Sequence, residues 1–139
     1  MALGLSDLEG LKIPKIRKDG THVYYIFALI YDDSITGVPK EKIIEALTAE
    51  GVPGLKMKYV NLHLLPMYQK KIAYGSKGFP WTISNREISY DKGICPVAEN
   101  LNDSSFIGIE MCRYDYSFDE IDRIIESFRK VWKNLNQLK

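Results

Sequence analysis

A chain of 139 residues is long enough for one domain and too short for two ordinary ones. Its 19 lysines and arginines nearly balance its 18 aspartates and glutamates, which argues against a nucleic-acid or membrane-surface module because such modules carry a basic excess. No apolar run reaches the roughly 18 residues of a membrane span. Two cysteines without C-x-x-C spacing exclude a disulfide framework, so we expect reduced thiols in a cytoplasmic protein.

The chain begins with scattered leucines and then a proline, a pattern typical of a helix tail and a connector. We therefore assign residues 1–21 to a connector and residues 22–139 to the domain. The segment His22–Tyr31 is rich in aromatic and β-branched residues, and both of its alternating sets are apolar. This pattern predicts a strand in the middle of a sheet, because only such a strand is covered on both faces.

A helix is expected next, with Pro39 at its first position and Gly51 as its left-handed stop. Residues 55–59 form a short strand candidate. The segment Asn61–Tyr68 is apolar but irregular, and residues 70–92, rich in glycine, predict a long surface excursion of the kind that is usually functional or mobile.

The last third of the chain carries the clearest helical pattern. Pro96 opens a short helix to about Asn102, and residues 106–112 predict a further strand. Residues 118–135 repeat apolar side chains at helical spacing behind a capping box of Ser117 and Glu120. The fold class expected is therefore α+β, with a small antiparallel or mixed sheet of about three strands and helices packed on one face.

One stretch of thirteen residues gathers cationic, phenolic and imidazole groups that could grip an anionic substrate or a phosphate. These groups are Lys56, Lys58, Tyr59, Asn61, His63 and Tyr68. A solvated loop with a hydrogen-bonded histidine explains the same pattern. No phosphate loop, nucleophile elbow or metal-ligand spacing occurs, so we predict no catalytic residue and no metal site in this chain.

Five strings, in order from about His22 to Trp132, resemble the C-terminal domain of the DegT/DnrJ/EryC1/StrS aminotransferases, fold-type-I enzymes that use pyridoxal phosphate. The strings are HVYYIFALIYD, KEKIIEALTAEGVP, YVNLHLLPMY, CPVAENL and DYSFDEIDRIIESFRKVW. The third is similar to the family's H-Y-x-P-L-H-x-x-P-x-Y segment. Lys58 stands where the family commonly has the first histidine of that segment, and Asn61 stands where it has proline.

The resemblance implies a part of an aminotransferase for keto-sugars or cyclitol ketones, with glutamate or glutamine as the usual amino donor. In that family a large domain holds the pyridoxal phosphate and the lysine that bonds to it. The expected partner is therefore that large domain or a separate chain carrying it, no cofactor is expected on this chain alone, and a homodimer is left open. Lys58, Tyr59, His63 and Tyr68 are the substrate-binding residues that we predict.

A second interpretation stays open. The chain could be a free-standing binding or regulatory module that holds an amino acid or a sugar nucleotide, because a small α+β fold does not by itself determine a function.

Overall fold

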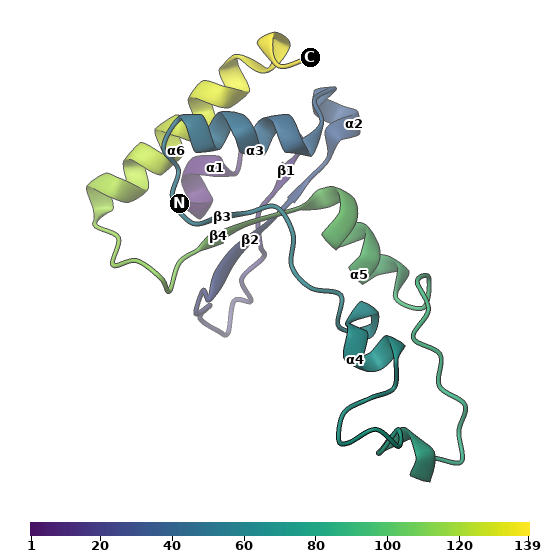
Figure 1. The fold of residues 1–139 in the computed structure, drawn as a ribbon. Helices are drawn as coiled ribbons and strands as arrows, with labels where there is room; N and C mark the ends of the chain where they lie inside the picture. The colour runs from purple at the N-terminus through teal and green to yellow at the C-terminus, as the bar shows by residue number, and fades with distance from the viewer. The chain divides into compact units, whose positions relative to one another are not determined.

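The computed structural model describes all of residues 1–139 and shows an α+β chain (Figure 1), which confirms the predicted fold class. The chain divides into two compact units, each described here by itself. Unit 1 comprises Met1–Lys58 and Ser104–Lys139, and unit 2 comprises Tyr59–Asp103. None of the helices combines the length and the apolar character that a membrane crossing requires.

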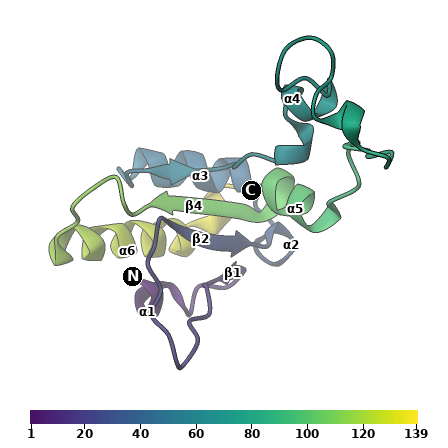
Figure 2. The ribbon, with the colours of Figure 1, turned by 90° about the horizontal axis from the view of Figure 1, so that it is seen from below.

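Unit 1 is built on a four-stranded antiparallel sheet with the order β1-β2-β4-β3. The strands are β1 (Leu11–Lys12), β2 (Ile26–Tyr31), β3 (Leu55–Lys56) and β4 (Phe106–Glu110). The two longest strands pair at the centre, where Phe27 lies opposite Ile109 and Leu29 lies opposite Ile107. The order from β1 through β2 to β4 can be followed in Figure 2. The predicted central position of β2 is confirmed.

Helices cover one face of this sheet, as predicted. In β2, Phe27, Leu29 and Tyr31 are buried, whereas Ala28 and Ile30 between them are exposed. The buried face packs against α1 (Ala2–Leu5), α3 (Lys40–Ala49) and α6 (Phe118–Lys133). Figure 1 shows α3 and α6 side by side on the same side of the sheet, where they contact each other. The expectation that both faces of β2 are covered is wrong, because no helix of unit 1 packs on the second face.

The hydrophobic core lies between the sheet and these helices. It contains fifteen buried apolar residues, and all of them belong to unit 1. They are Leu5, Leu8, Leu11, Phe27, Leu29, Tyr31, Val38, Ile43, Leu47, Val52, Ile107, Ile109, Ile124, Phe128 and Val131. Residues 1–21 thus contribute three leucines to the core. A domain boundary at residue 21 stays a prediction.

The helix α6 begins with the capping box that the sequence predicts. The Ser117 hydroxyl accepts the Glu120 backbone N–H at 3.3 Å, and the Glu120 carboxylate accepts the Ser117 backbone N–H at 2.8 Å. Towards the end of the helix, Phe128 stacks on Trp132 with ring centroids 5.8 Å apart. The Trp132 indole donates to the Glu9 carbonyl at 2.8 Å, which attaches the helix to the N-terminal segment.

Several predicted boundaries differ from the structure. The strand expected over 22–31 begins at Ile26, and those expected over 55–59 and 106–112 end at Lys56 and Glu110. Pro39 is the N-cap of α3 rather than its first residue, with a ψ of 141° that is extended and not helical. Gly51 has a φ of 84°, which confirms the left-handed stop. Apolar composition predicts strand type well, but it does not mark where a partner strand ends.

Unit 2 is an insertion between the neighbouring strands β3 and β4. It contains only short elements, namely the 3-10 turns Leu62–Leu64 and Trp81–Ile83, α4 (Pro66–Gln69) and α5 (Pro96–Asn100). The Tyr59 backbone N–H donates to the Asn102 side-chain oxygen at 3.0 Å, so the two ends of the insertion lie together. A π-helical turn, Leu101–Ser105, leads from α5 into β4.

Candidate functional site

The predicted substrate segment forms two tight turns at the start of unit 2. Leu62–Leu64 is a single 3-10 turn, and α4 follows after Leu65, which has the extended backbone of an N-cap. Pro66 occupies the first position of α4, where its missing N–H leaves no donor unsatisfied. His63 therefore lies in the first turn and Tyr68 in the second.

His63 is held in the interior of unit 2 by a carboxylate. Its Nε2 atom lies 2.8 Å from Glu99 Oε1, and less than a tenth of either side chain is exposed. Glu99 comes from α5, 36 residues later in the chain. The pair therefore joins two of the strings that carry the family resemblance, YVNLHLLPMY and CPVAENL.

The Glu99 carboxylate is the polar centre of this unit. It accepts the backbone N–H of Gly93 at 2.8 Å and that of Cys95 at 3.2 Å, besides contacting His63. The Gly93 N–H is the largest cause that lowers the pKa of Glu99, followed by the Cys95 N–H and the His63 side chain, because each stabilises the charged form. Glu99 is thus an ionised acceptor that fixes the loop before α5.

Three aromatic rings form a second cluster in unit 2. Tyr68 lies edge-on to Trp81, with centroids 6.2 Å apart, and 5.2 Å from the ring of Tyr90. The Trp81 indole donates to the Tyr90 hydroxyl at 2.9 Å. Gln69 joins the two clusters, since its side-chain amide donates to the carbonyls of His63 at 2.8 Å and of Tyr90 at 2.6 Å.

A cavity of about 480 Å³ opens beside the aromatic cluster. Its lining mixes aromatic, cationic, amide, hydroxyl and carboxylate groups. The lining residues are Tyr68, Gln69, Lys71, Glu87, Ile88, Ser89, Tyr90 and Asp91. This size and this mixture match sites for small polar ligands, which use apolar rings for contact and a few polar groups for orientation.

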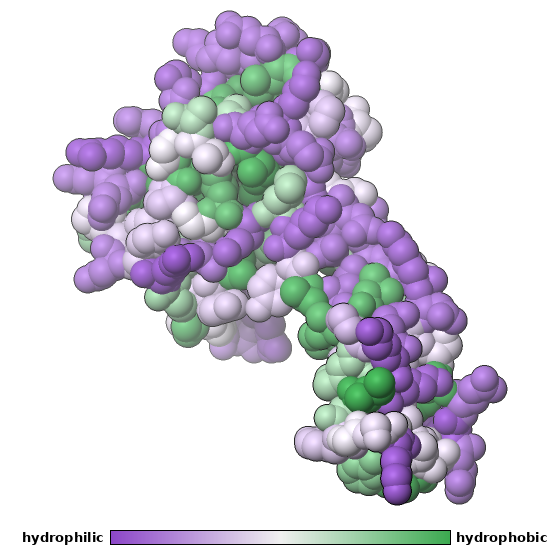
Figure 3. Space-filling view, viewed as in Figure 1, coloured by the Kyte–Doolittle hydropathy of each residue, from purple (hydrophilic) through white to green (hydrophobic).

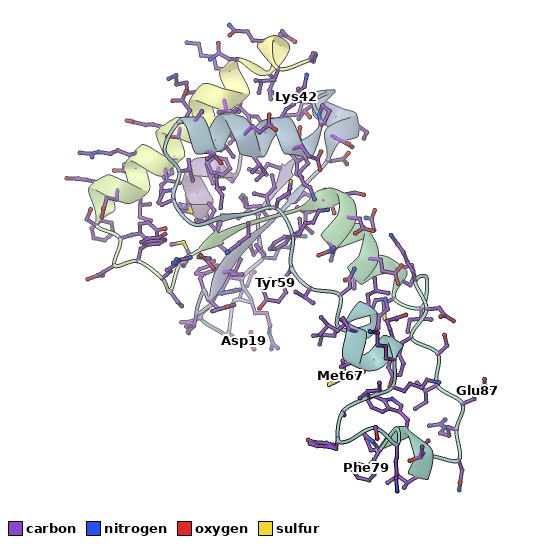
Figure 4. The ribbon with its side chains drawn as sticks, in the orientation of Figure 1. Asp19, Lys42, Tyr59, Met67, Phe79 and Glu87 are labelled. Atoms are coloured by element: carbon purple, nitrogen blue, oxygen red, sulfur yellow. The ribbon has the colours of Figure 1, made fainter.

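The four residues that the sequence grouped as substrate-binding differ in their surroundings. Lys58 is the last residue of the first segment of unit 1 and is exposed, whereas the other three belong to unit 2. Tyr59 is 57% exposed at the start of unit 2, where Figure 4 labels it. His63 is buried on Glu99, and Tyr68 lines the cavity. Only Tyr59 and Tyr68 thus present ring surface that a ligand within unit 2 could contact.

Sequence reasoning missed Glu99, Gln69, Trp81 and Tyr90 as members of this arrangement. Glu99 lies in the string CPVAENL, so the sequence showed an acidic residue there but did not show that His63 is its partner. Trp81 and Tyr90 sit in a glycine- and proline-rich stretch without periodicity, so no pattern indicated that they face Tyr68. Asn61 has a buried side-chain nitrogen without a hydrogen-bond partner, which the sequence did not indicate either.

Comparison with known proteins gives two relatives and no matching protein-family model. The chain is 26% identical over 128 residues, 91% of its length, to the spore coat polysaccharide biosynthesis protein SpsC of Bacillus subtilis (strain 168). It is 29% identical over 104 residues, 74% of its length, to the uncharacterized protein MJ1066 of Methanocaldococcus jannaschii. The matches cover 28% and 26% of these proteins, so the chain spans about a quarter of the curated relatives.

Unit 2 lacks one feature that commonly holds pyridoxal phosphate, a long helix beside the cavity. The phosphate of such a cofactor is commonly bound at a helix N-terminus, but α4 and α5 contain only four and five residues. The one buried lysine, Lys40, lies in unit 1 and donates to the Met57 carbonyl at 3.2 Å. A lysine that bonds to the cofactor needs a free amine in a pocket. Lys71 lines the cavity of unit 2, but none of the five family-like strings contains it. We therefore derive no reaction step through the cofactor.

Proposed function

We propose that this chain is the small C-terminal domain of a pyridoxal-phosphate-dependent aminotransferase of the DegT/DnrJ/EryC1/StrS family, acting on a keto-sugar or a cyclitol ketone. The observation that carries the proposal is the similarity to SpsC over 91% of the chain, together with the five family-like strings in the same order. The name of SpsC refers to polysaccharide biosynthesis, which supports a sugar as the substrate class. The remaining three quarters of such a protein would hold the cofactor.

The role of this chain in that enzyme is to supply part of the wall around the substrate. Tyr59 and Tyr68 offer phenol groups and ring surface from unit 2. His63 is buried, so we assign it a positioning role: its pair with Glu99 holds the segment that carries both tyrosines. Lys58 adds an exposed cation directly before Tyr59 in the chain, suited to a phosphate or carboxylate of the substrate.

The test is an assay of amino transfer in the complete protein, which contains the cofactor-binding part and this chain. Glutamate and a nucleotide-linked keto-sugar are supplied, and 2-oxoglutarate is measured. We expect turnover by the complete protein and none by the 139-residue chain alone. Turnover by the chain alone, or none by the complete protein with any keto-sugar or cyclitol ketone, contradicts the proposal.

Tyrosine variants test the substrate wall. Tyr59→Phe and Tyr68→Phe each remove one hydroxyl, and we expect roughly a tenfold rise in KM for the keto substrate from a lost hydrogen bond. Tyr74→Phe is the matched control, because Tyr74 is 72% exposed in the same unit and lies outside the family-like strings. Equal KM values for all three variants would show that the hydroxyls of Tyr59 and Tyr68 do not contact the substrate.

The cavity of about 480 Å³ favours a second candidate function, a free-standing module that binds a small metabolite. Thermal shift measurements on the chain alone, with amino acids, sugar phosphates and sugar nucleotides, distinguish the two. Saturable stabilisation by one of these compounds without any partner chain supports the binding module. A flat response to all of them supports the aminotransferase domain.

A further inference from the structure

Unit 2, unlike unit 1, contains no buried apolar side chain. In Tyr59–Asp103, only the polar side chains of His63 and Glu99 are buried. Eleven large apolar side chains of this unit are between 37% and 74% exposed. They are Tyr59, Val60, Leu62, Met67, Ile72, Tyr74, Phe79, Ile83, Ile88, Ile94 and Val97. Figure 3 shows apolar surface of this unit among hydrophilic side chains.

From its burial, we expect unit 2 to be only marginally stable by itself. Buried apolar area is the main driving force for folding, and this unit has no buried apolar residue. Its order rests on the hydrogen bonds of Glu99 and Gln69 and on three partly buried rings. A unit of this size lies near the lower limit for independent folding, where disulfides, metals or association with another surface are usually needed.

Surface apolar residues are ordinary when they occur singly, but eleven in one short unit without a core need another explanation. Unit 2 is also a long insertion whose ends are held together by the hydrogen bond from Tyr59 to Asn102. Long insertions on a stable scaffold commonly carry a binding function. Unit 1, with fifteen buried apolar residues, is such a scaffold.

We propose that unit 2 is a docking segment that becomes stably ordered only against the large, cofactor-binding part of the protein. The choice of this occupant rests on the proposed function and on chain length, because the matches cover only 28% and 26% of the two relatives. In each relative, about three quarters of the protein lies outside the match, and this part could provide the apolar surface on which unit 2 docks. Docking would bury the exposed apolar side chains and bring Tyr59 and Tyr68 to the substrate.

Hydrogen exchange measured by mass spectrometry tests the docking segment. In the 139-residue chain alone, we expect amides of unit 2 to be protected only about 10- to 100-fold, whereas those of β2, β4 and α6 exchange orders of magnitude more slowly. In the complete protein, exchange in unit 2 should slow by a further factor of at least about ten. Equal protection of unit 2 and β2 in the isolated chain, or no slowing in the complete protein, overturns the proposal.

Two variants identify the surface. Leu62→Ser and Val97→Ser change side chains that are 63% and 74% exposed in unit 2, and each should reverse the slowing in the complete protein by about tenfold. Leu3→Ser is the matched control, because Leu3 is 91% exposed in unit 1 and should have no effect. If exchange in unit 2 of the isolated chain slows as the protein concentration rises, the surface binds a second copy of the chain. That result would overturn the choice of partner.

The exchange experiment does not depend on amino transfer, so the two proposals can fail separately. Slower exchange in a complete protein that transfers no amino group supports docking and contradicts the aminotransferase. Amino transfer without slower exchange supports the aminotransferase and contradicts docking.

Discussion

Glu99 is the residue on which the local structure of unit 2 most depends. One carboxylate receives hydrogen bonds from two backbone N–H groups and contacts the imidazole of His63. These partners come from two segments that are about thirty residues apart in the chain. A buried carboxylate with such partners is satisfied, whereas its removal leaves several polar groups without a partner at once. We therefore expect removal of the Glu99 carboxylate to loosen unit 2 more than removal of any exposed acid in the same unit.

Glu99→Gln tests this role, because it keeps the size of the side chain and replaces one acceptor oxygen by an NH₂ group. That group faces backbone donors, so we expect the amides of Gly93 and Cys95 to exchange roughly tenfold faster. Glu87→Gln is the matched control, an exposed acid of the same unit that Figure 4 labels. Unchanged exchange at Gly93 in Glu99→Gln would show that the carboxylate does not hold this loop.

The same carboxylate makes unit 2 sensitive to acid in a stated direction. The pKa of Glu99 is lowered from its ordinary value of 4.5, above all by the Gly93 N–H. A carboxylate whose pKa is lower in the folded state stabilises that state above pH 4.5, and this contribution is lost as the pH falls through the lowered value. The NMR shifts of the Gly93 and Cys95 amides should therefore titrate together with a midpoint below pH 4.5. In Glu99→Gln they should not titrate, and a midpoint at or above 4.5 in the natural sequence contradicts the assignment.

At the scale of residues, the sequence could name candidates but could not pair them. His63 and Tyr68 were recognisable from the string that contains them, yet the string did not show that His63 is buried. The histidine was expected either to grip an anionic substrate or to be hydrogen-bonded within a solvated loop; the structure shows its contact with Glu99, and a role in substrate binding stays a prediction. Pairing across 36 residues of chain depends on tertiary structure, which no local pattern encodes.

At the scale of elements, periodicity was most informative where an element is long. The helix α6 was predicted with its capping box because sixteen residues repeat one apolar face. The strand β1 was not predicted, since two residues cannot show alternation and its pairing with β2 is set by the packing of the N-terminal leucines. The strand β2 was predicted too long, because the aromatic residues before Ile26 have the composition of a strand without a partner strand.

The core face of α6 gives a prediction with a control on the same helix. Phe128 is fully buried and stacks on Trp132, whereas Phe118 in the first turn is 90% exposed. Phe128→Ala should lower the free energy of unfolding by about 3–5 kcal/mol, through lost burial and the cavity left behind. Phe118→Ala should change it by less than about 0.5 kcal/mol.

Urea unfolding followed by far-ultraviolet circular dichroism measures both phenylalanine variants. Similar midpoints for the two would show that α6 is not packed on the sheet as described. A large effect of Phe118→Ala alone would point to the same conclusion.

At the scale of the whole molecule, the fold is a two-layer unit with an insertion between two paired strands. Unit 1 has the sheet, the covering helices and all fifteen buried apolar residues. Unit 2 lies between β3 and β4 in the chain and contributes none of them. The sequence did predict residues 70–92 as a long excursion, but it did not show that the excursion belongs to a larger unit that begins at Tyr59. Recognising such a unit requires burial, which depends on the folded structure.

The insertion leads to a prediction about independent stability. Because the Tyr59 N–H donates to the Asn102 side chain, residues 60–101 can be replaced by a linker of about six glycines and serines without separating β3 from β4. Unit 1 should then still unfold cooperatively. A shorter connection also loses less entropy on closure, so the free energy of unfolding should stay equal or rise by roughly 1–2 kcal/mol. Loss of cooperative unfolding in this variant would mean that the core of unit 1 needs the insertion, because nothing else was removed.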